Sequence, residues 1–207
     1  LGRILRKNSE EARKDLDAQN EFEVLGGQVA VPILDRETLL ALLGELGSRL
    51  DRRGVAVELY VVGGTAMTLA YDRERLTHDI DATWEDASEL AEVVEEIARE
   101  RGLPGDWLND RVRPMLPRVV DVDQVEALAI PGIRVAVASP RHMIAMKARA
   151  ARDARDLDDL MLLCRLDGFA WVEEVIAMAV SVWGPGMLRE DTLFALRTGL
   201  TERGLAP

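Results

Sequence analysis

The stretch Val61–Trp84 reads VVGGTAMTLAYDRERLTHDIDATW, and it decides the fold that the sequence predicts. Val55–Val62, which leads into it, is rich in β-branched residues and stops at a pair of glycines, as a buried strand before a tight turn does. Thr65–Tyr71 has the composition of a short helix, and Thr77–Trp84 alternates like a second strand. The sequence therefore predicts a strand, a glycine turn, a short helix and a second strand.

Two aspartates, Asp79 and Asp81, flank one isoleucine in the second predicted strand. Side chains two residues apart on a strand point to the same face, with Cα atoms about 6.6 Å apart, at ~3.3 Å of rise per residue. Paired carboxylates can bind hard cations such as Mg²⁺, which prefer oxygen ligands. Gly63 and Gly64 allow a tight turn into the short helix, whose first N–H groups favour phosphate. This order predicts glycines that contact phosphates and aspartates that hold the bridging metal.

Either feature alone is weak evidence for catalysis. Asp-x-Asp pairs are common in strands with one solvated face, and a double glycine is common before any helix. The two features together, in this order and with a predicted strand before each, are much more specific.

The composition fits one domain, or one domain with a small helical appendage, because the chain has 207 residues, 48% of them hydrophobic. A net charge of -11 argues against a surface that binds nucleic acid everywhere, although arginines gather in Arg111–Arg118 and Arg141–Arg155. Cys164 is the only cysteine, which excludes an internal disulfide and a cysteine-based zinc site. No apolar run approaches the ~20 residues that span a bilayer, so we expect a cytoplasmic protein without a membrane partner.

The rest of the chain predicts an α+β fold. Further strands are expected at Pro117–Val125 and Ile133–Ser139. Apolar spacing and capping residues predict helices at Asp35–Leu50, Ser88–Arg101, from Ser139-Pro140 through Arg165, Trp171–Trp183 and Leu188–Arg203. Strands therefore come early, and only helices follow Ser139. We expect three parts: an N-terminal extension (residues 1–34), an α/β core (35–139) and a helical C-terminal portion (140–207) that completes the active site.

The glycine and aspartate segment resembles the signature of the polymerase β-type nucleotidyltransferase superfamily. It is more closely similar to the AbiEii-like and MenT-like nucleotidyltransferase toxins of bacterial toxin–antitoxin systems, whose pattern is Y-h-V-G-G-x-A-M-x-L-A-Y-x-x-x-R-x-T-x-D-h-D. Here the matching residues are Tyr60 to Met67, Tyr71, Arg75, Thr77, Asp79 and Asp81. Three later segments continue the likeness: Asp106–Pro117 (DWLNDRVRPMLP), Val135–Lys147 (VAVASPRHMIAMK) and Arg155–Leu160 (RDLDDL).

This resemblance implies a polymerase β-like nucleotidyltransferase fold, with a small mixed sheet followed by the helical portion. It also implies roles for single residues. Contacts to the nucleoside triphosphate (NTP) are expected from Gly63, Gly64, Thr65, Arg75 and Lys147. Asp79 and Asp81 are expected to bind Mg²⁺ (or Mn²⁺), and Thr77 is expected to lie at the border of the metal site. Lys147 is the residue expected to grip phosphate, and an ammonium on an otherwise Ala/Met face suits that role.

The position of a third carboxylate is open. A straight helix from Lys147 would bring Asp158 to within about 20° of the lysine and put Asp156 on the far side. The R-D-x-x-D box instead favours Asp156 and Asp159, which requires a break near Arg152-Asp153, where Asp153 is a plausible N-cap. We expect the box to hold.

Two further groups of residues are candidates. Asp121 and Asp123 form another alternating pair and could supply a strand-borne third carboxylate, or else mark the exposed face of an edge strand. Phosphate or substrate contacts are possible from Arg75, Arg111, Arg113, Arg152 and Arg155, although such arginines are more often solvated surface.

The resemblance implies an enzyme that transfers a nucleotidyl group from an NTP to a tRNA 3′ end, blocks translation and is controlled by a cognate antitoxin protein. Nucleotidyl transfer to a protein or a small molecule is the alternative within the enzyme class, and the charge of -11 favours it slightly. A non-catalytic binding module with the same fold is the alternative outside that class. The sequence does not indicate which NTP or which tRNA is used.

Overall fold

The computed structural model describes residues 32–72, 74–85, 88–150 and 154–207, and Pro32–Pro207 forms one compact unit. Most of the predicted extension, residues 1–34, lies outside the described residues. Of its last three residues, Leu34 is buried in the core and exchanges two backbone hydrogen bonds with Thr77, at 2.7 and 3.0 Å. Leu34 therefore packs with the part of the chain that carries the aspartates.

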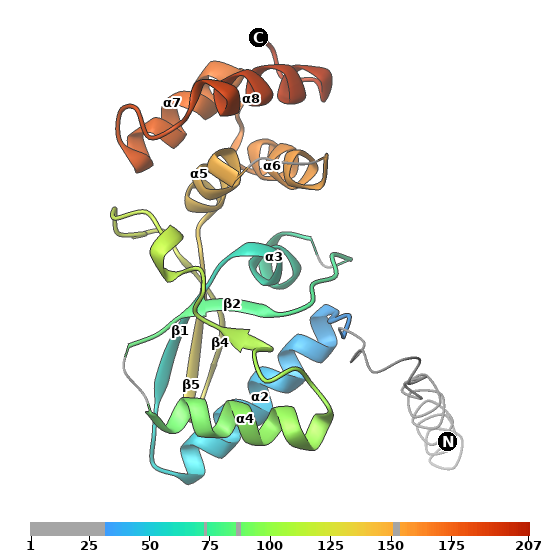
Figure 1. Cartoon of the computed structure of the whole chain (residues 1–207), viewed down its shortest axis with the longest axis vertical. Coiled ribbons are helices and arrows are strands. Elements are labelled where there is room, and N and C mark those ends of the chain that lie inside the picture. Colours follow the sequence, from blue (N-terminus) through green and yellow to red (C-terminus); the bar gives the residue numbers. More distant parts are fainter. Residues whose placement is uncertain (1–31, 73, 86–87, 151–153) are drawn as a thin grey trace, which may run out of the picture. The chain divides into compact units, whose positions relative to one another are not determined.

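The sheet has five strands in the order β3-β2-β1-β5-β4 (Figure 1). Its centre is β1 (Val57–Val61), which is parallel to β5 (Ile133–Val137) and antiparallel to β2 (Ile80–Thr83). At the edges, β3 (Leu108–Asn109) is parallel to β2, and β4 (Val125–Ile130) is antiparallel to β5. This small mixed sheet with its helices confirms the predicted α+β class.

The prediction of a strand at Pro117–Val125 is wrong. This segment is irregular, and β4 begins only at its last residue. The alternation of valine and aspartate resembles a strand, but the buried side chain is Asp121, whereas Val120 and Val122 are 77% and 82% exposed. Hydrogen bonds to the Asp121 carboxylate hold the segment in this conformation instead of ladder bonds. The edge strands β3 and β4 were not predicted.

The helices α2 (Arg36–Arg52) and α4 (Ser88–Arg101) form where the leucine and valine spacing predicts them. The carboxylate of Asp35 accepts a hydrogen bond from the Thr38 amide at 2.8 Å, which caps α2. The helix packs against α4 and β5. The apolar faces of the two helices bury Leu39, Leu42, Leu43, Leu46 and Leu50, and Leu90, Val93, Val94 and Ile97.

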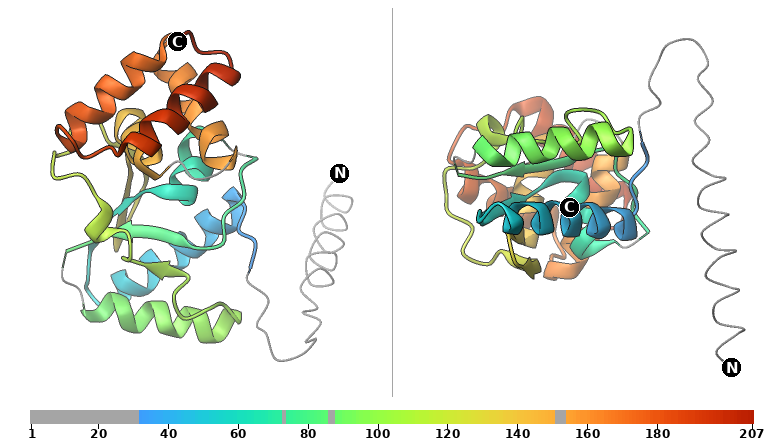
Figure 2. Two further views of the ribbon diagram at one scale, coloured as in Figure 1. Left: turned by 45° about the horizontal axis from the view of Figure 1, so that its top comes forward. Right: turned by 90° about the horizontal axis from the view of Figure 1, so that it is seen from below.

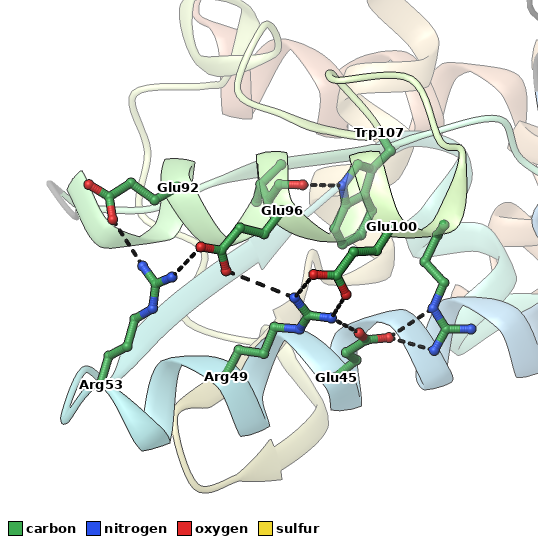
Figure 3. A network of polar contacts seen from close by, with 9 residues as sticks. Glu45, Arg49, Arg53, Glu92, Glu96, Glu100 and Trp107 are labelled. Carbon is green, nitrogen blue, oxygen red and sulfur yellow. Dashed lines mark hydrogen bonds and ion pairs between the residues drawn. The ribbon is translucent and has the colours of Figure 1, made fainter.

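An ionic network joins α2 to α4 (Figure 3). Arg49 pairs with Glu45 on its own helix and with Glu100 on α4, while Arg53 pairs with Glu96 at 2.7 Å. The hydrogen bond to Glu100 is the main cause of the raised pKa of Arg49. Exposed ion pairs of this kind each contribute at most about 1 kcal/mol, so the apolar contacts below them dominate.

A short helical segment follows β1. It starts as α3 (Gly63–Ala66) and continues as a π-helix, η1 (Met67–Tyr71), in which the Asp72 amide donates to the Met67 carbonyl at 2.8 Å. The predicted helix at Thr65–Tyr71 is therefore present, but its second part is wider than an α-helix.

The described residues of the C-terminal portion form the helices α5 (Pro140–Ala150), α6 (Ala154–Asp167), α7 (Val172–Trp183) and α8 (Glu190–Glu202) (Figure 2). Helix α5 follows β5 directly and packs against α6 and α7, while α8 packs against α7. Within the described ranges, no helix is both long and apolar enough to cross a bilayer. The lysine predicted to bind phosphate thus lies on the helix that joins the sheet to the helical portion.

Candidate active site

The glycine turn and the Asp81 carboxylate lie against each other. Gly63 begins α3 with a φ of +66°, in the left-handed region that favours glycine. A Cβ atom on Gly63 would lie 3.0 Å from Oδ2 of Asp81. The Val62 amide donates to the Asp81 carbonyl at 3.0 Å, which fixes β2 beside the turn. The absence of a side chain at position 63 therefore leaves space in front of this carboxylate.

Asp79 lies in the bend that precedes β2, not on the strand as predicted. Its backbone carbonyl accepts hydrogen bonds from the hydroxyls of Thr65 at 2.6 Å and Thr77 at 3.3 Å, instead of ladder bonds. Its carboxylate accepts a hydrogen bond from the Asn109 side-chain amide at 3.2 Å. The bend is thus held in place by side chains from three segments.

The carboxylates of Asp79 and Asp81 lie close enough to repel each other. Burial raises the pKa of Asp81, and the charge of Asp79 raises it further, against a smaller opposite effect of Asn109 and Arg111. A bound cation would relieve this repulsion, and hard divalent cations prefer such oxygen donors. The residues that the structure describes contain no group of three or more His, Cys, Asp or Glu side chains that could hold a metal. The acidic pair is thus a set of oxygen donors of the kind that a hard cation accepts.

Thr77 packs behind the glycine turn and is buried. A Cβ atom on Gly64 would lie 2.7 Å from Oγ1 of Thr77, so the second glycine is required by this close approach. The hydroxyl of Thr68 bonds the carbonyls of Gly64 and Arg75, at 3.1 and 3.0 Å. Threonine hydroxyls thus connect the turn to the bend that carries Asp79.

Lys147 on α5 contacts both aspartates of the R-D-x-x-D box. Its Nζ atom lies 2.9 Å from Asp156 Oδ1 and 2.7 Å from Asp159 Oδ2. The same oxygen of Asp159 accepts a hydrogen bond from Nη2 of Arg75 at 2.8 Å. Two cations and two carboxylates therefore form one cluster that joins the segment before Asp79 to α5 and α6.

The described parts of α5 and α6 pack against each other, so they are not parts of one straight helix. Asp158, which a straight helix would bring near Lys147, instead pairs with Arg203 at 2.7 Å. Asp156 and Asp159 of the R-D-x-x-D box, and not Asp158, thus lie next to Lys147. Arg152 and the predicted cap Asp153 lie outside the described residues.

Asp156 and Asp159 have different surroundings. Asp159 is 6% exposed and is bonded to two cations, so it has the environment of a structural anchor. Asp156 lines a cavity of about 320 Å³ beside Gly63 and Lys147. The lining of that cavity also has an apolar part, which includes Met143, Met146 and Trp183. Asp79 and Asp81 are not among its lining residues, although Gly63, which the Asp81 side chain approaches, is.

Asp121 and Asp123 are not on a strand, so the prediction of a strand-borne third carboxylate is wrong. Asp121 is buried, and its carboxylate accepts hydrogen bonds from Tyr60 Oη at 2.7 Å and the Ser139 amide at 2.8 Å. His142 Nδ1 lies 3.3 Å from its other oxygen. Asp121 therefore anchors the start of α5, while Asp123 is exposed in a turn.

Most candidate arginines have partners within the protein. Arg111 pairs with Asp106, Arg113 pairs with Asp110, and Arg155 donates to the Leu76 carbonyl at 2.8 Å. The sequence analysis predicted no function for Asn109, Arg149 and Trp183, which the structure places at the site. Asn109 belongs to the W-L-N-D likeness, which could have identified it, whereas Arg149 and Trp183 come together only through the packing of α5 and α7.

The comparisons with known proteins agree with this geometry at the level of the family. The family described as "Nucleotidyltransferase of unknown function (DUF6036)" matches residues 37–184, a range that includes the glycine turn, both aspartates of the pair and the lysine cluster. No curated protein and no solved structure matched the chain. The resemblance to nucleotidyltransferases is thus confirmed, whereas the family match does not extend to the toxin branch. Because the match covers more than half of its length, the chain belongs to this nucleotidyltransferase family.

Proposed function

We propose that the protein is a Mg²⁺-dependent (or Mn²⁺-dependent) enzyme that transfers a nucleotidyl group from an NTP to an acceptor hydroxyl, with release of pyrophosphate. The observation that supports this most is the position of the Asp81 carboxylate beside Gly63 and near Asp79. A methyl group at residue 63 would fill the space in front of the carboxylate. A metal-bound triphosphate needs this space if it is to approach both the backbone and the acidic pair.

In this proposal, Asp79 and Asp81 hold the metal ion, which when bound offsets the negative charge of the triphosphate. Gly63 keeps the backbone accessible to the phosphate chain, and Gly64 lets Thr77 pack against the turn. Thr65 and Thr77 hold the bend of Asp79 in position. Asn109 orients the Asp79 carboxylate through its side-chain amide. The chain thus supplies a rigid acidic pair next to an open stretch of backbone.

Lys147 has three N–H donors, of which two contact Asp156 and Asp159. We assign the third donor to a phosphate oxygen. Either Asp81 or Asp156 would accept the proton of the attacking hydroxyl. Asp159 is unsuitable as that base because it is buried and bonded to both Arg75 and Lys147.

We further propose a tRNA 3′ end as the acceptor, a toxin role in a toxin–antitoxin system and a cytoplasmic location. The support is the resemblance of the glycine–aspartate segment, Asp106–Pro117 and Arg155–Leu160 to the AbiEii-like and MenT-like enzymes. Control by a cognate antitoxin protein belongs to the same proposal.

The test is to incubate the protein with Mg²⁺, total tRNA and each NTP in turn, with the label on the α-phosphate. The wild type should label tRNA with at least one NTP, and Asp79→Ala should abolish the labelling while circular dichroism shows an intact fold. The exposed Asp123→Asn variant is the control and should keep its activity. Undiminished labelling by Asp79→Ala would reject the assignment.

Transfer to a protein or a small molecule is the second candidate, because a net charge of -11 opposes the approach of a polyanion. The dependence on salt separates the two. Transfer to tRNA should fall steeply as salt rises, because each phosphate contact releases counterions. Transfer to a small acceptor should depend on salt only weakly.

A further inference from the structure

The cation that sequence reasoning assigned to phosphate, Lys147, has its charge largely offset within the protein. It contacts the carboxylates of Asp156 and Asp159 at 2.9 and 2.7 Å, and Arg75 is the second cation of the same cluster. Among the described residues, the two positive and two negative charges of this cluster balance. A triphosphate carries several negative charges, so a binding cleft needs positive charge beyond this cluster.

Arg149 is a second cation on the wall of the same cavity. It lies two residues beyond Lys147 on α5 and is exposed. Its guanidinium carbon lies 4.2 Å from the centroid of the Trp183 ring, and within the described part of the chain it has no carboxylate at ion-pair distance. The stacked face of the guanidinium is thus covered, while its N–H donors have no acidic partner among the residues that the structure describes.

Trp183 is itself fixed in place. Its Nε1 atom donates a hydrogen bond to the Ala145 carbonyl on α5 at 2.8 Å, and it is the last residue of α7. The indole therefore presents a firm surface on which the Arg149 side chain rests. Such a support lowers the loss of side-chain entropy when the arginine binds a ligand.

The other described arginines close to the site are engaged. Arg75 pairs with Asp159, Arg111 with Asp106, and Arg113 with Asp110. Arg149 differs from them because its contact is with an aromatic ring, and no carboxylate of the described residues pairs with it.

We propose that Arg149, positioned by Trp183, is the principal phosphate-binding cation of this cleft. A planar guanidinium presents two parallel N–H donors that match two oxygens of one phosphate, whereas an ammonium acts as a point charge. The proposal rests on the proposed function, because it takes the cavity beside Gly63 to be the site for phosphorylated substrates. The phosphate belongs either to the NTP or to the 3′ end of a nucleic acid acceptor, and the arms of the experiment distinguish these sources.

The test is equilibrium binding by calorimetry at low salt, with inorganic tripolyphosphate in one arm and total tRNA in the other. The variants are Arg149→Gln, which removes the charge but keeps most of the side chain, and Arg149→Lys, which keeps the charge. Arg165→Gln is the matched control, because Arg165 is an exposed arginine on α6 outside the cavity. We expect Arg149→Gln to weaken binding about ten- to a hundredfold, the range for a lost hydrogen bond to a charged group, and Arg149→Lys to weaken it less.

The role of Trp183 has its own readout. Trp183→Leu removes the aromatic face. We expect it to weaken phosphate binding when Arg149 is present, but not to weaken it further when it is combined with Arg149→Gln. This non-additivity shows that Trp183 acts through the arginine, whereas a general effect on folding would add to the loss in both backgrounds.

Each outcome bears on the proposal. A loss in the tripolyphosphate arm assigns Arg149 to the NTP, and a loss in the tRNA arm alone assigns it to the acceptor. Equal affinities of Arg149→Gln and Arg165→Gln in both arms, or no binding by the wild type in either arm, would overturn the proposal. Failure of the proposed function is a separate result, because it is seen as transfer activity that survives Asp79→Ala and does not depend on these affinities.

Discussion

The Cα atom of Gly63 faces the carboxylate of Asp81 so closely that a Cβ atom there would lie 3.0 Å from Oδ2. This contact makes the glycine turn and the acidic pair one structural unit. It joins the end of β1 to β2, the two strands that flank the proposed site. Substitutions on either side of the contact should therefore separate effects on stability from effects on catalysis.

Gly63→Ala should lower both stability and activity. Its φ of +66° costs an alanine about 1–2 kcal/mol, and the added methyl group also displaces the Asp81 carboxylate. Gly54→Ala is the matched control, since Gly54 has a φ of +72° with no heavy atom near its missing Cβ. Denaturant unfolding should show a similar loss in both variants, while transfer activity is lost only in Gly63→Ala. Equal activity in the two variants would contradict the proposed role of the turn.

Gly64→Ala should destabilise the protein by about 1–3 kcal/mol, because its methyl group would lie 2.7 Å from Oγ1 of Thr77 in a buried site. The double variant Gly64→Ala/Thr77→Ala should recover part of this loss, since it removes the hydroxyl that is in the way. Gly44→Ala, on α2 with open space around it, should instead stabilise by about 0.5–1 kcal/mol. Chemical denaturation of these three variants, of the single variant Thr77→Ala and of the wild type measures these differences. A double variant no more stable than expected from additivity would contradict the contact.

Asp159→Asn should destabilise the protein by about 3 kcal/mol, because it leaves Arg75 and Lys147 without their shared carboxylate in a largely buried site. Asp158→Asn removes a neighbouring carboxylate whose side chain is 69% exposed and should cost less than about 1 kcal/mol. The free energy of unfolding of each variant tests this contrast. Similar values for the two would show that the cluster does not anchor α5 and α6 to the segment before Asp79.

Asp81→Asn should raise the melting temperature of the metal-free protein at neutral pH. The folded state raises the pKa of Asp81, so the folded protein binds this proton more tightly than the unfolded chain does, and the ionised form becomes a cost as the pH rises above the ordinary value of 3.8. The gain should disappear below that value, where the carboxyl is protonated in both states. Thermal unfolding in EDTA across this pH range measures it, and a lower melting temperature for Asp81→Asn at pH 7 would contradict the repulsion.

Cys164 should resist alkylation in the folded protein. Burial raises the pKa of its thiol to about 12, so almost no thiolate is present at neutral pH, and the side chain is enclosed in the core. Iodoacetamide should modify it far more slowly in the native protein than in guanidinium chloride, as mass spectrometry can follow. Equal rates under the two conditions would show that α6 opens readily.

The sequence predicts most of the fold because its periodic segments are long. Helix α4 matches its predicted bounds, since Leu90, Val93, Val94 and Ile97 form a clear stripe between recognisable ends. The irregular segment before β4 misled the prediction, because alternation does not reveal which side chain is buried. There Asp121 is buried by partners distant in sequence, Tyr60 and Ser139.

The candidate site was predictable only in part, for the same reason. The glycines and the acidic pair lie within one short segment, so their spacing carries the information. The pairing of Lys147 with Asp156 and Asp159 depends on where α5 ends, which the sequence left open. The stacking of Arg149 on Trp183 joins residues from two helices, and no local pattern encodes it.

The most direct test of the central claim is whether Asp79 and Asp81 together bind a divalent cation. Free Mn²⁺ can be measured by its electron paramagnetic resonance signal during titration of the protein in the presence of a non-hydrolysable NTP analogue. We predict that the wild type removes more Mn²⁺ from solution than the analogue alone does, and that Asp79→Asn/Asp81→Asn removes no more than the analogue. Undiminished Mn²⁺ uptake by a correctly folded double variant would contradict the account.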